Sequence, residues 1–226
     1  MEAFSMKKDK QERMYAAAED KVVSDRSYNL TIGLVLLWGF GLNYLMATKL
    51  SAAILGLNPI VLLIGYMVLS FGSIFLIHRS SNPAVSFLGF TVLSLAMGAI
   101  LTFALQAYTN TTIEKALITT ILLIVIMIGL SVLNPAFFLS IGRVLGISLV
   151  VCILANILLV LIFRMDLVLL DWAVALIFCG YIGYDWAVSQ QYSKTLDHAI
   201  DSAADLYVDI INLFIRLLAI FGRRDD

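Results

Sequence analysis

Residues 167–188, LVLLDWAVALIFCGYIGYDWAV, and residues 202–221, SAADLYVDIINLFIRLLAIF, decide the fold of this chain. Each stretch is predominantly apolar and has about the 20 residues that an α-helix needs to cross a hydrocarbon core of about 30 Å. Each also carries an acid inside its apolar run, Asp185 in the first and Asp209 in the second. The two stretches therefore predict transmembrane helices that each hold a costly charge.

Five further windows of the same kind precede these two, at residues 28–48, 59–78, 84–106, 113–133 and 144–163. The chain is 61% hydrophobic and 14% charged, with a mean hydropathy of +0.96, whereas soluble domains hold roughly 25% charged residues. These values exclude a soluble globule and predict an all-α membrane protein with about seven transmembrane helices in the lipid bilayer. We expect one domain at residues 28–222, between a cytoplasmic head at residues 1–27 and a charged tail at residues 223–226.

Asparagine–proline pairs mark the boundaries of three windows. Asn58-Pro59 opens the second window, Asn82-Pro83 opens the third, and Asn134-Pro135 follows the fourth. Proline interrupts a helix interior but is tolerated in its first turn, so these pairs predict short turns between consecutive helices.

Lysine and arginine residues near the window ends predict the orientation. Nine fall on the side of the head: Lys7, Lys8, Lys10, Arg13, Lys21, Arg26, Arg79, Arg143 and Lys194. Six fall on the other side: Lys49, Lys115, Arg164, Arg216, Arg223 and Arg224. Because cytoplasmic loops carry the excess of these residues, the head is predicted to be cytoplasmic. The C-terminal arginines favour an alternative, in which six spans are followed by a re-entrant seventh segment.

Several other protein classes do not fit the sequence. The first 26 residues lack the apolar core and cleavage site of a signal peptide, so we expect a retained head. Cys152 and Cys179 lie in apolar stretches without the spacing of a zinc site, and we expect reduced, buried thiols. The basic residues of the head alternate with acids rather than with aromatic residues, so nucleic acid is not an expected partner.

Asp185 and Asp209 are the main candidates for a functional site. An ionised aspartate near the centre of a bilayer costs about 2.5–3.5 kcal/mol on insertion scales, and such residues usually face a bundle interior. The two flank a hairpin at about residues 189–201, so antiparallel packing would place both in the cytoplasmic half of the membrane. Two neighbouring carboxyl groups at low dielectric do not easily both ionise. We therefore expect a coupled pair that holds the helices together when protonated and repels when fully ionised.

A polar stripe runs along the last window. Its members follow at intervals of four, four, three and four residues: Asp201, Asp205, Asp209, Asn212 and Arg216. This spacing places them on one helix face, while apolar residues surround most of the remaining circumference. The pattern favours a helix at the centre of a bundle, and an amphipathic helix on the membrane surface is the alternative. Asp205, Asn212 and the earlier Asp171 are candidates for an ion path, although Asp171 also fits a residue at a helix start.

The C-terminal sequence resembles the transmembrane Bax inhibitor motif family, whose members end in stretches such as LYLDFINLFLxLLRIFG. Here the chain ends DLYVDIINLFIRLLAIFGRRDD, and an aspartate near the end of the sixth helix in a YDTQ-like context is matched by Tyr184-Asp185. The agreeing positions are Leu206, Tyr207, Asp209, Ile211, Asn212, Leu213, Phe214, Leu217, Leu218, Ile220, Phe221 and Gly222. The likeness extends loosely over all seven windows, and the last two carry the diagnostic residues.

The resemblance, which is to bacterial-type members, implies six helices around a central seventh and a calcium leak that depends on pH. It implies that Asp185 and Asp209 are the sensor, that calcium ions and protons are the small partners, and that the membrane is a bacterial plasma membrane. Bacterial relatives pair an arginine at the end of the second helix with the sixth-helix aspartate. Arg79 is the nearest match here, and a positive-inside anchor is its alternative role.

Two departures from the family pattern bear on the expected site. Trp186-Ala187 replaces the usual Thr-Gln and removes hydrogen-bonding groups beside Asp185, while Asp205 adds an acid one turn before Asp209. Calcium usually takes six to eight oxygen ligands, so Asp185 and Asp209 would form only a weak, transient calcium contact that suits passage. We expect no resident cofactor.

Three other functions are compatible with buried aspartates. An ion-coupled carrier would use them together with polar points such as Asn43, Gln106 and Asn156. A regulator would act by binding other membrane proteins, which the sequence neither supports nor excludes. An intramembrane aspartyl protease is disfavoured because Asp209 lies in LYVD rather than in a GxGD context, so we do not expect an enzyme.

Overall fold

The computed structural model describes residues 22–159 and 168–223. Within them the chain is all-α, as predicted, with α2 at Asp25–Lys49, α3 at Ser51–Leu55, α4 at Pro59–Arg79, α5 at Pro83–Leu105, α6 at Asn110–Leu133, α7 at Pro135–Leu158, α8 at Val168–Ser189 and α9 at Leu196–Gly222. Of these, α2 and α4 to α8 are long and apolar enough to cross a membrane. The 27 residues of α9 reach about 40 Å, which is also sufficient in length.

Asparagine side chains cap the helices that begin with proline. Asn58 accepts a hydrogen bond from the Ile60 amide and Asn82 accepts one from the Ala84 amide, both at 2.9 Å. Asn134 ends α6 and also caps α7, so these two helices are joined by a single residue. Such caps satisfy amides that have no partner inside the helix, which explains why the Asn-Pro pairs mark helix starts.

Two predicted boundaries were wrong. The fifth window was expected to begin at residue 144, but α7 begins at Pro135 because Asn134 caps it directly; the predicted end at residue 163 lies outside the described residues. The last window was expected to begin at residue 202, but α9 begins at Leu196, where the Thr195 side chain accepts a hydrogen bond from the His198 amide. Hydropathy misses both starts since these first turns are less apolar than the spans that follow. The short α3 was not predicted, and residues 1–21 and 224–226 of the predicted head and tail lie outside the described residues.

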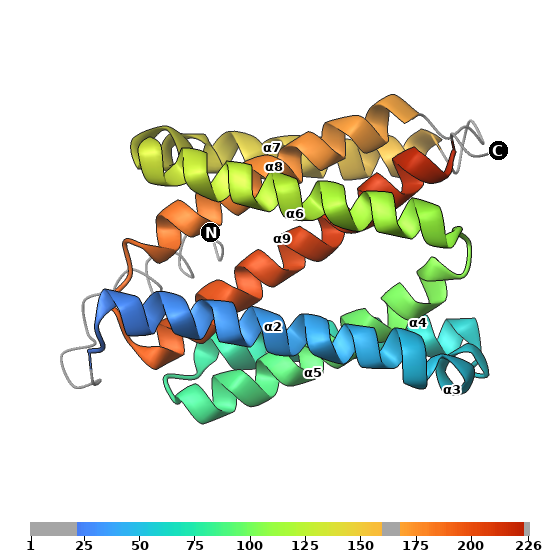
Figure 1. The fold of residues 1–226 in the computed structure, drawn as a ribbon, viewed down its shortest axis with the longest axis horizontal. Coiled ribbons are helices and arrows are strands. Elements are labelled where there is room, and N and C mark those ends of the chain that lie inside the picture. The colour runs from blue at the N-terminus through green and yellow to red at the C-terminus, as the bar shows by residue number, and fades with distance from the viewer. Residues whose placement is uncertain (1–21, 160–167, 224–226) are drawn as a thin grey trace.

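The C-terminal helix occupies the centre of the bundle (Figure 1). It packs against α2, α5, α6 and α8, and it crosses diagonally between a layer containing α6, α7 and α8 and a layer containing α2, α3, α4 and α5. The remaining long helices, α4 and α7, make their main contacts with α5 and α8. The expected central seventh helix is therefore confirmed, with four helices forming its main contacts and two lying further out.

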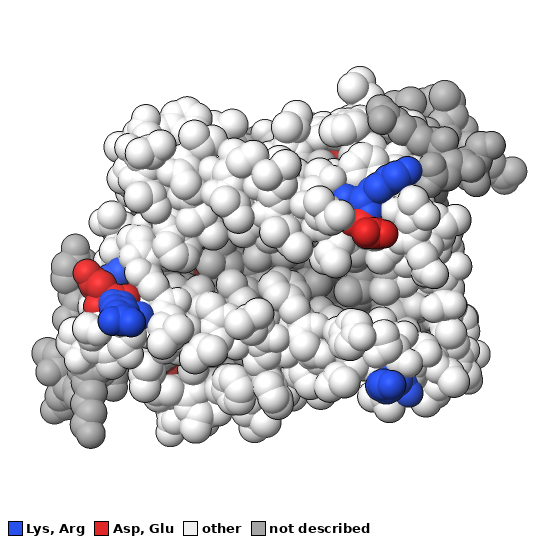
Figure 2. Space-filling model, in the orientation of Figure 1, with Lys and Arg blue, Asp and Glu red and all other residues white. Residues whose placement is uncertain are grey.

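Burial follows this arrangement. Tyr207, Leu213 and Leu218 of α9 are fully buried, whereas Phe71 of α4 and Val144 of α7 are 69% and 62% exposed. Large apolar side chains exposed on outer helices are what a bilayer solvates. In the space-filling view, charged side chains gather toward the two ends of the bundle, and an uncharged band lies between them (Figure 2). We call the end where residues 190–195 join α8 to α9 the hairpin end, and the other the C-terminal end.

Candidate functional site

The polar stripe predicted on the last helix lies inside the bundle on α9. Asp209 is 6% exposed, and the other four members, Asp201, Asp205, Asn212 and Arg216, are partly buried. Asn212 donates its side-chain amide to a backbone carbonyl one turn earlier on α9, at 2.8 Å. Neighbouring helices enclose the stripe, so the alternative of a helix lying on the membrane surface does not fit the structure.

Asp185 and Asp209 come together between α8 and α9. Asp209 interacts with Asp185 through a side-chain hydrogen bond and through charge, and Asp205 places a further negative charge nearby. Oδ2 of Asp209 is buried and has no hydrogen-bond partner among the described residues. A hydrogen bond between two carboxyl groups requires a proton on one of them. The geometry therefore joins two helices through a contact that can depend on protonation; the role of the two residues as a sensor stays a prediction.

The end of α4 brings a histidine to the stripe. His78 Nε2 lies 3.5 Å from Asp205 Oδ1, and the two side chains are 32% and 29% exposed. Arg79 is exposed, with its Cζ 5.5 Å from the centre of the Phe75 ring on the same helix. The proposed pairing of Arg79 with Asp185 stays a prediction. The resemblance pointed to an arginine at the end of this helix, and His78 precedes Arg79 in the same helix turn.

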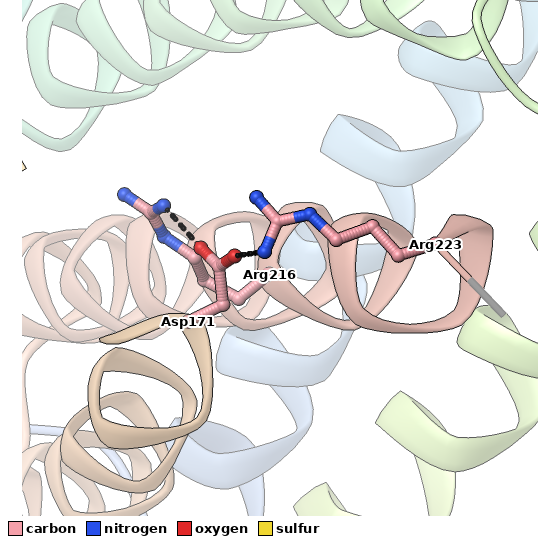
Figure 3. A network of polar contacts seen from close by, with 3 residues as sticks. All are labelled: Asp171, Arg216 and Arg223. Atoms are coloured by element: carbon pink, nitrogen blue, oxygen red, sulfur yellow. Dashed lines mark hydrogen bonds and ion pairs between the residues drawn. The ribbon is translucent and has the colours of Figure 1, made fainter. Parts of the chain in front are cut away.

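Asp171 lies at the other end of α8, between two arginines (Figure 3). Its Oδ1 accepts a hydrogen bond from Arg216 Nη1 at 2.9 Å, and its Oδ2 lies 2.9 Å from Arg223 Nη1. The Asp171 side chain is 7% exposed, and the two arginines are 33% and 36% exposed. As expected, Asp171 lies in the first turn of its helix. Its carboxylate is engaged in an ion-pair cluster that sequence reasoning did not anticipate.

A buried hydrogen-bonded pair fixes the face of α9 that lies toward α2. Asn43 donates to Tyr207 Oη at 2.8 Å, and the Tyr207 hydroxyl lies 3.1 Å from Asn43 Oδ1. A Cβ added at Gly39 would lie 3.1 Å from the Tyr207 ring and 2.8 Å from the Phe90 ring, so glycine permits this close approach. Asn43, considered as a polar point for a carrier, therefore joins two helices.

Tyr28 and Lys194 fasten the hairpin end. The buried Tyr28 hydroxyl donates to the Ser189 carbonyl at 3.0 Å and lies 3.0 Å from Ser202 Oγ. Lys194 Nζ lies 4.4 Å from the centre of the Tyr28 ring, within the range of a cation–π contact. Burial lowers the pKa of Lys194, and the charge of Asp25 partly opposes this effect. The first turn of α2 is thereby attached to both helices of the hairpin.

Another acid of α9 is held by a hydroxyl. Asp197 is 4% exposed, and its Oδ1 accepts a hydrogen bond from Ser86 Oγ of α5 at 2.7 Å. In the part of the chain that the structure describes, no three His, Cys, Asp or Glu side chains come together to hold a metal ion. Asp197, Asp205 and Asp209 instead each contact a side chain of another helix.

Comparisons with known proteins agree with this architecture. Residues 21–226 match the model of the Bax1-I family, described as inhibitor of apoptosis-promoting Bax1. Over 59 residues the chain is 46% identical to Protein LIFEGUARD 4 of Arabidopsis thaliana, and this match covers 26% of the chain and 23% of that relative. Because the family model covers most of the chain, this multi-pass membrane protein belongs to the Bax1-I family.

Proposed function

We propose that this protein is a pH-sensitive cation leak channel gated by Asp185 and Asp209, with calcium as the transported ion. The observation that supports the proposal is the contact between a nearly buried carboxyl group on the central helix and a second carboxyl group on its neighbour. The contact lies between α8 and the central helix α9. Asp205 lies close enough to contribute its charge to the same site.

The gate would work through the proton that the two carboxyl groups share. At acidic pH the shared proton holds α8 against α9 by a hydrogen bond. When both groups ionise, their repulsion is strong because the surroundings have a low dielectric constant, and the charges draw water and cations between the helices. Flux is therefore expected to rise with pH. Calcium would meet too few protein oxygens here to remain bound, which suits passage rather than storage.

The wider setting follows from the same proposal. The distribution of lysine and arginine residues supports a cytoplasmic N-terminus, and the bacterial plasma membrane rests on the resemblance to bacterial-type members alone. In this proposal α9 crosses the membrane as the seventh span, since it lies among helices that are long and apolar enough to do so. The protein acts without a resident cofactor and is not an enzyme.

Calcium flux into proteoliposomes containing purified protein tests the proposal. The pH-dependent flux of the unchanged protein should be lost in Asp185→Asn and in Asp209→Asn, because an amide cannot become a carboxylate. Glu114→Gln is the matched control, since it removes an exposed acid of α6 and should leave the pH dependence unchanged. Flux that does not vary with pH in the unchanged protein would exclude the gate.

Other outcomes would indicate the alternatives. Saturable flux that requires a counter-ion would favour an ion-coupled carrier. Cleavage of a membrane peptide that either substitution abolishes would favour a protease. An absence of flux under all conditions, in protein shown to be folded, would leave a regulator that binds other membrane proteins.

A further inference from the structure

The polar stripe of α9 ends at the C-terminal end of the bundle in a cluster of opposite charges. Arg216, its last member, lies two turns beyond Asp209, about 10 Å along the helix. Both residues are directed toward α8, where Asp209 meets Asp185 and Arg216 meets Asp171. A cation moving along the stripe would therefore pass the aspartate pair and then reach the arginines.

From this geometry we infer that Asp171, Arg216 and Arg223 form a second closure of the ion path, with Asp171 as the positioning residue that holds the arginines in place. The inference rests on the proposed leak function. Both carboxylate oxygens of Asp171 are occupied, each by a different guanidinium group at 2.9 Å. Such charge-assisted contacts are stronger than hydrogen bonds between neutral groups.

The cluster joins the start of α8 to the end of α9, whereas the hairpin connects the opposite ends of these two helices. Asp171 belongs to the first turn of α8, and Arg223 caps the end of α9. These are favourable places for the two charges, because an acid complements the dipole at a helix start and a base complements it at a helix end. Figure 3 shows this cluster at one end of the two helices, and the hairpin joins them at the other, so α8 and α9 are held together on both sides of the aspartate pair.

The charge of the cluster would oppose a cation that reaches this end of the stripe. One carboxylate and two guanidinium groups sum to a net charge of +1 at this end of the stripe. Arg223 also lines a cavity of about 200 Å³ together with Tyr108, Thr109 and Thr112, at the junction of α5 and α6. Release of Arg223 from Asp171 would let the guanidinium group move toward this space and away from the stripe.

Asp171→Asn tests the closure, with Asp171→Glu as the conservative variant. In proteoliposomes at a pH where the unchanged protein leaks little, Asp171→Asn should increase calcium flux several-fold, while flux still rises with pH because Asp185 and Asp209 are intact. Asp171→Glu keeps the charge and should restore flux to near the unchanged value. A merely structural role would lower the yield of folded protein without raising its flux. Flux in Asp171→Asn at or below that of the unchanged protein would overturn the inference.

Arg223→Gln provides a second test of the closure in case Asp171→Asn does not fold. It removes only one of the two ion pairs and should raise flux in the same direction by a smaller factor. Equal flux in Arg223→Gln and the unchanged protein would then overturn the inference.

A distance measurement separates failure of the closure from failure of the leak function. Spin labels at Leu169 and Ile215, introduced after replacing Cys152 and Cys179 with serine, report the separation of α8 and α9 near the cluster. Asp171→Asn should lengthen and broaden the distribution of distances even in a protein that carries no calcium. An unchanged distribution would show that the cluster does not hold the helices, whatever the flux. A widened distribution without any flux in the unchanged protein would retain the cluster as the contact that holds α8 to α9 and reject the leak.

Discussion

The two ends of α9 hold charge in opposite ways. Toward the hairpin end, acids meet a hydroxyl, an imidazole and another carboxyl group, through Ser86, His78 and Asp185. Toward the C-terminal end, an arginine meets an aspartate, and a second arginine completes the cluster. The first set includes partners whose charge or hydrogen bonding can change with a proton, whereas the second is an ion-pair cluster. This contrast assigns the expected pH response to one part of the central helix.

The largest stability effect is expected at the ion-pair cluster. Asp171→Ala would leave two guanidinium groups without their shared partner, and breaking a buried pair typically costs 3–5 kcal/mol. Because both arginines are about one-third exposed, we expect a smaller loss of about 2 kcal/mol. Thermal unfolding of the purified protein in detergent should show a clearly lower midpoint.

Asp171→Glu is the control for this prediction and should lie between the alanine variant and the unchanged protein. Equal midpoints for Asp171→Ala and the unchanged protein would mean that the cluster contributes no net stability. The two ends of α9 would then differ in the charges that they hold but not in their contribution to stability.

The hairpin end depends on neutral hydrogen bonds, and Tyr28→Phe measures their contribution. The substitution removes a hydroxyl that donates to the Ser189 carbonyl and lies beside Ser202 Oγ, while the buried ring remains. Loss of one buried partner typically costs about 1–3 kcal/mol, and we expect about 1 kcal/mol because Ser202 can reorient its hydroxyl. Hydrogen exchange of residues 189–202 should become faster.

Tyr44→Phe is the matched control for Tyr28→Phe, since Tyr44 is 67% exposed on the same helix. It should leave both stability and exchange unchanged. If exchange became faster in Tyr44→Phe, or did not become faster in Tyr28→Phe, the Tyr28 hydroxyl would not stabilise the hairpin.

Hydropathy over about 20 residues is a strong signal in a membrane protein, and it predicted the long helices α2 and α4 to α9, although it missed the starts of α7 and α9. The sequence also placed the polar stripe on one face of α9, since that depends on helical spacing alone. Partners on other helices were harder to predict. Asp171 is far from Arg216 and Arg223 along the chain, and only the packing of α8 on α9 brings them together. Arg216 was predicted as a member of the stripe and Arg223 as a charge near the helix end, but neither position indicates a partner on α8.

The choice between His78 and Arg79 illustrates the same limit at finer scale. Adjacent residues on an α-helix point about 100° apart, so two neighbours can meet different surroundings. Helical spacing alone does not determine how α4 is rotated about its axis. The structure directs His78 toward Asp205 and leaves Arg79 over Phe75.

The smallest effect is expected for His78→Gln. Comparison with Arg79→Gln shows which of the two neighbours contributes, and whether the hairpin end of α9 responds to protons. Protonation of the His78 imidazole would add an ion-pair component to its contact with Asp205 at acidic pH, and this component is lost as pH rises. His78→Gln should therefore lower the unfolding midpoint at pH 5.5 more than at pH 8, by an amount equivalent to about 0.5 kcal/mol, as for other partly exposed pairs. Arg79→Gln is the matched control and should show no such dependence, because arginine keeps its charge at both values. If Arg79→Gln changes the pH dependence of flux while His78→Gln does not, the partner of the aspartate site is Arg79, and the end of α4 must rotate from the position seen here.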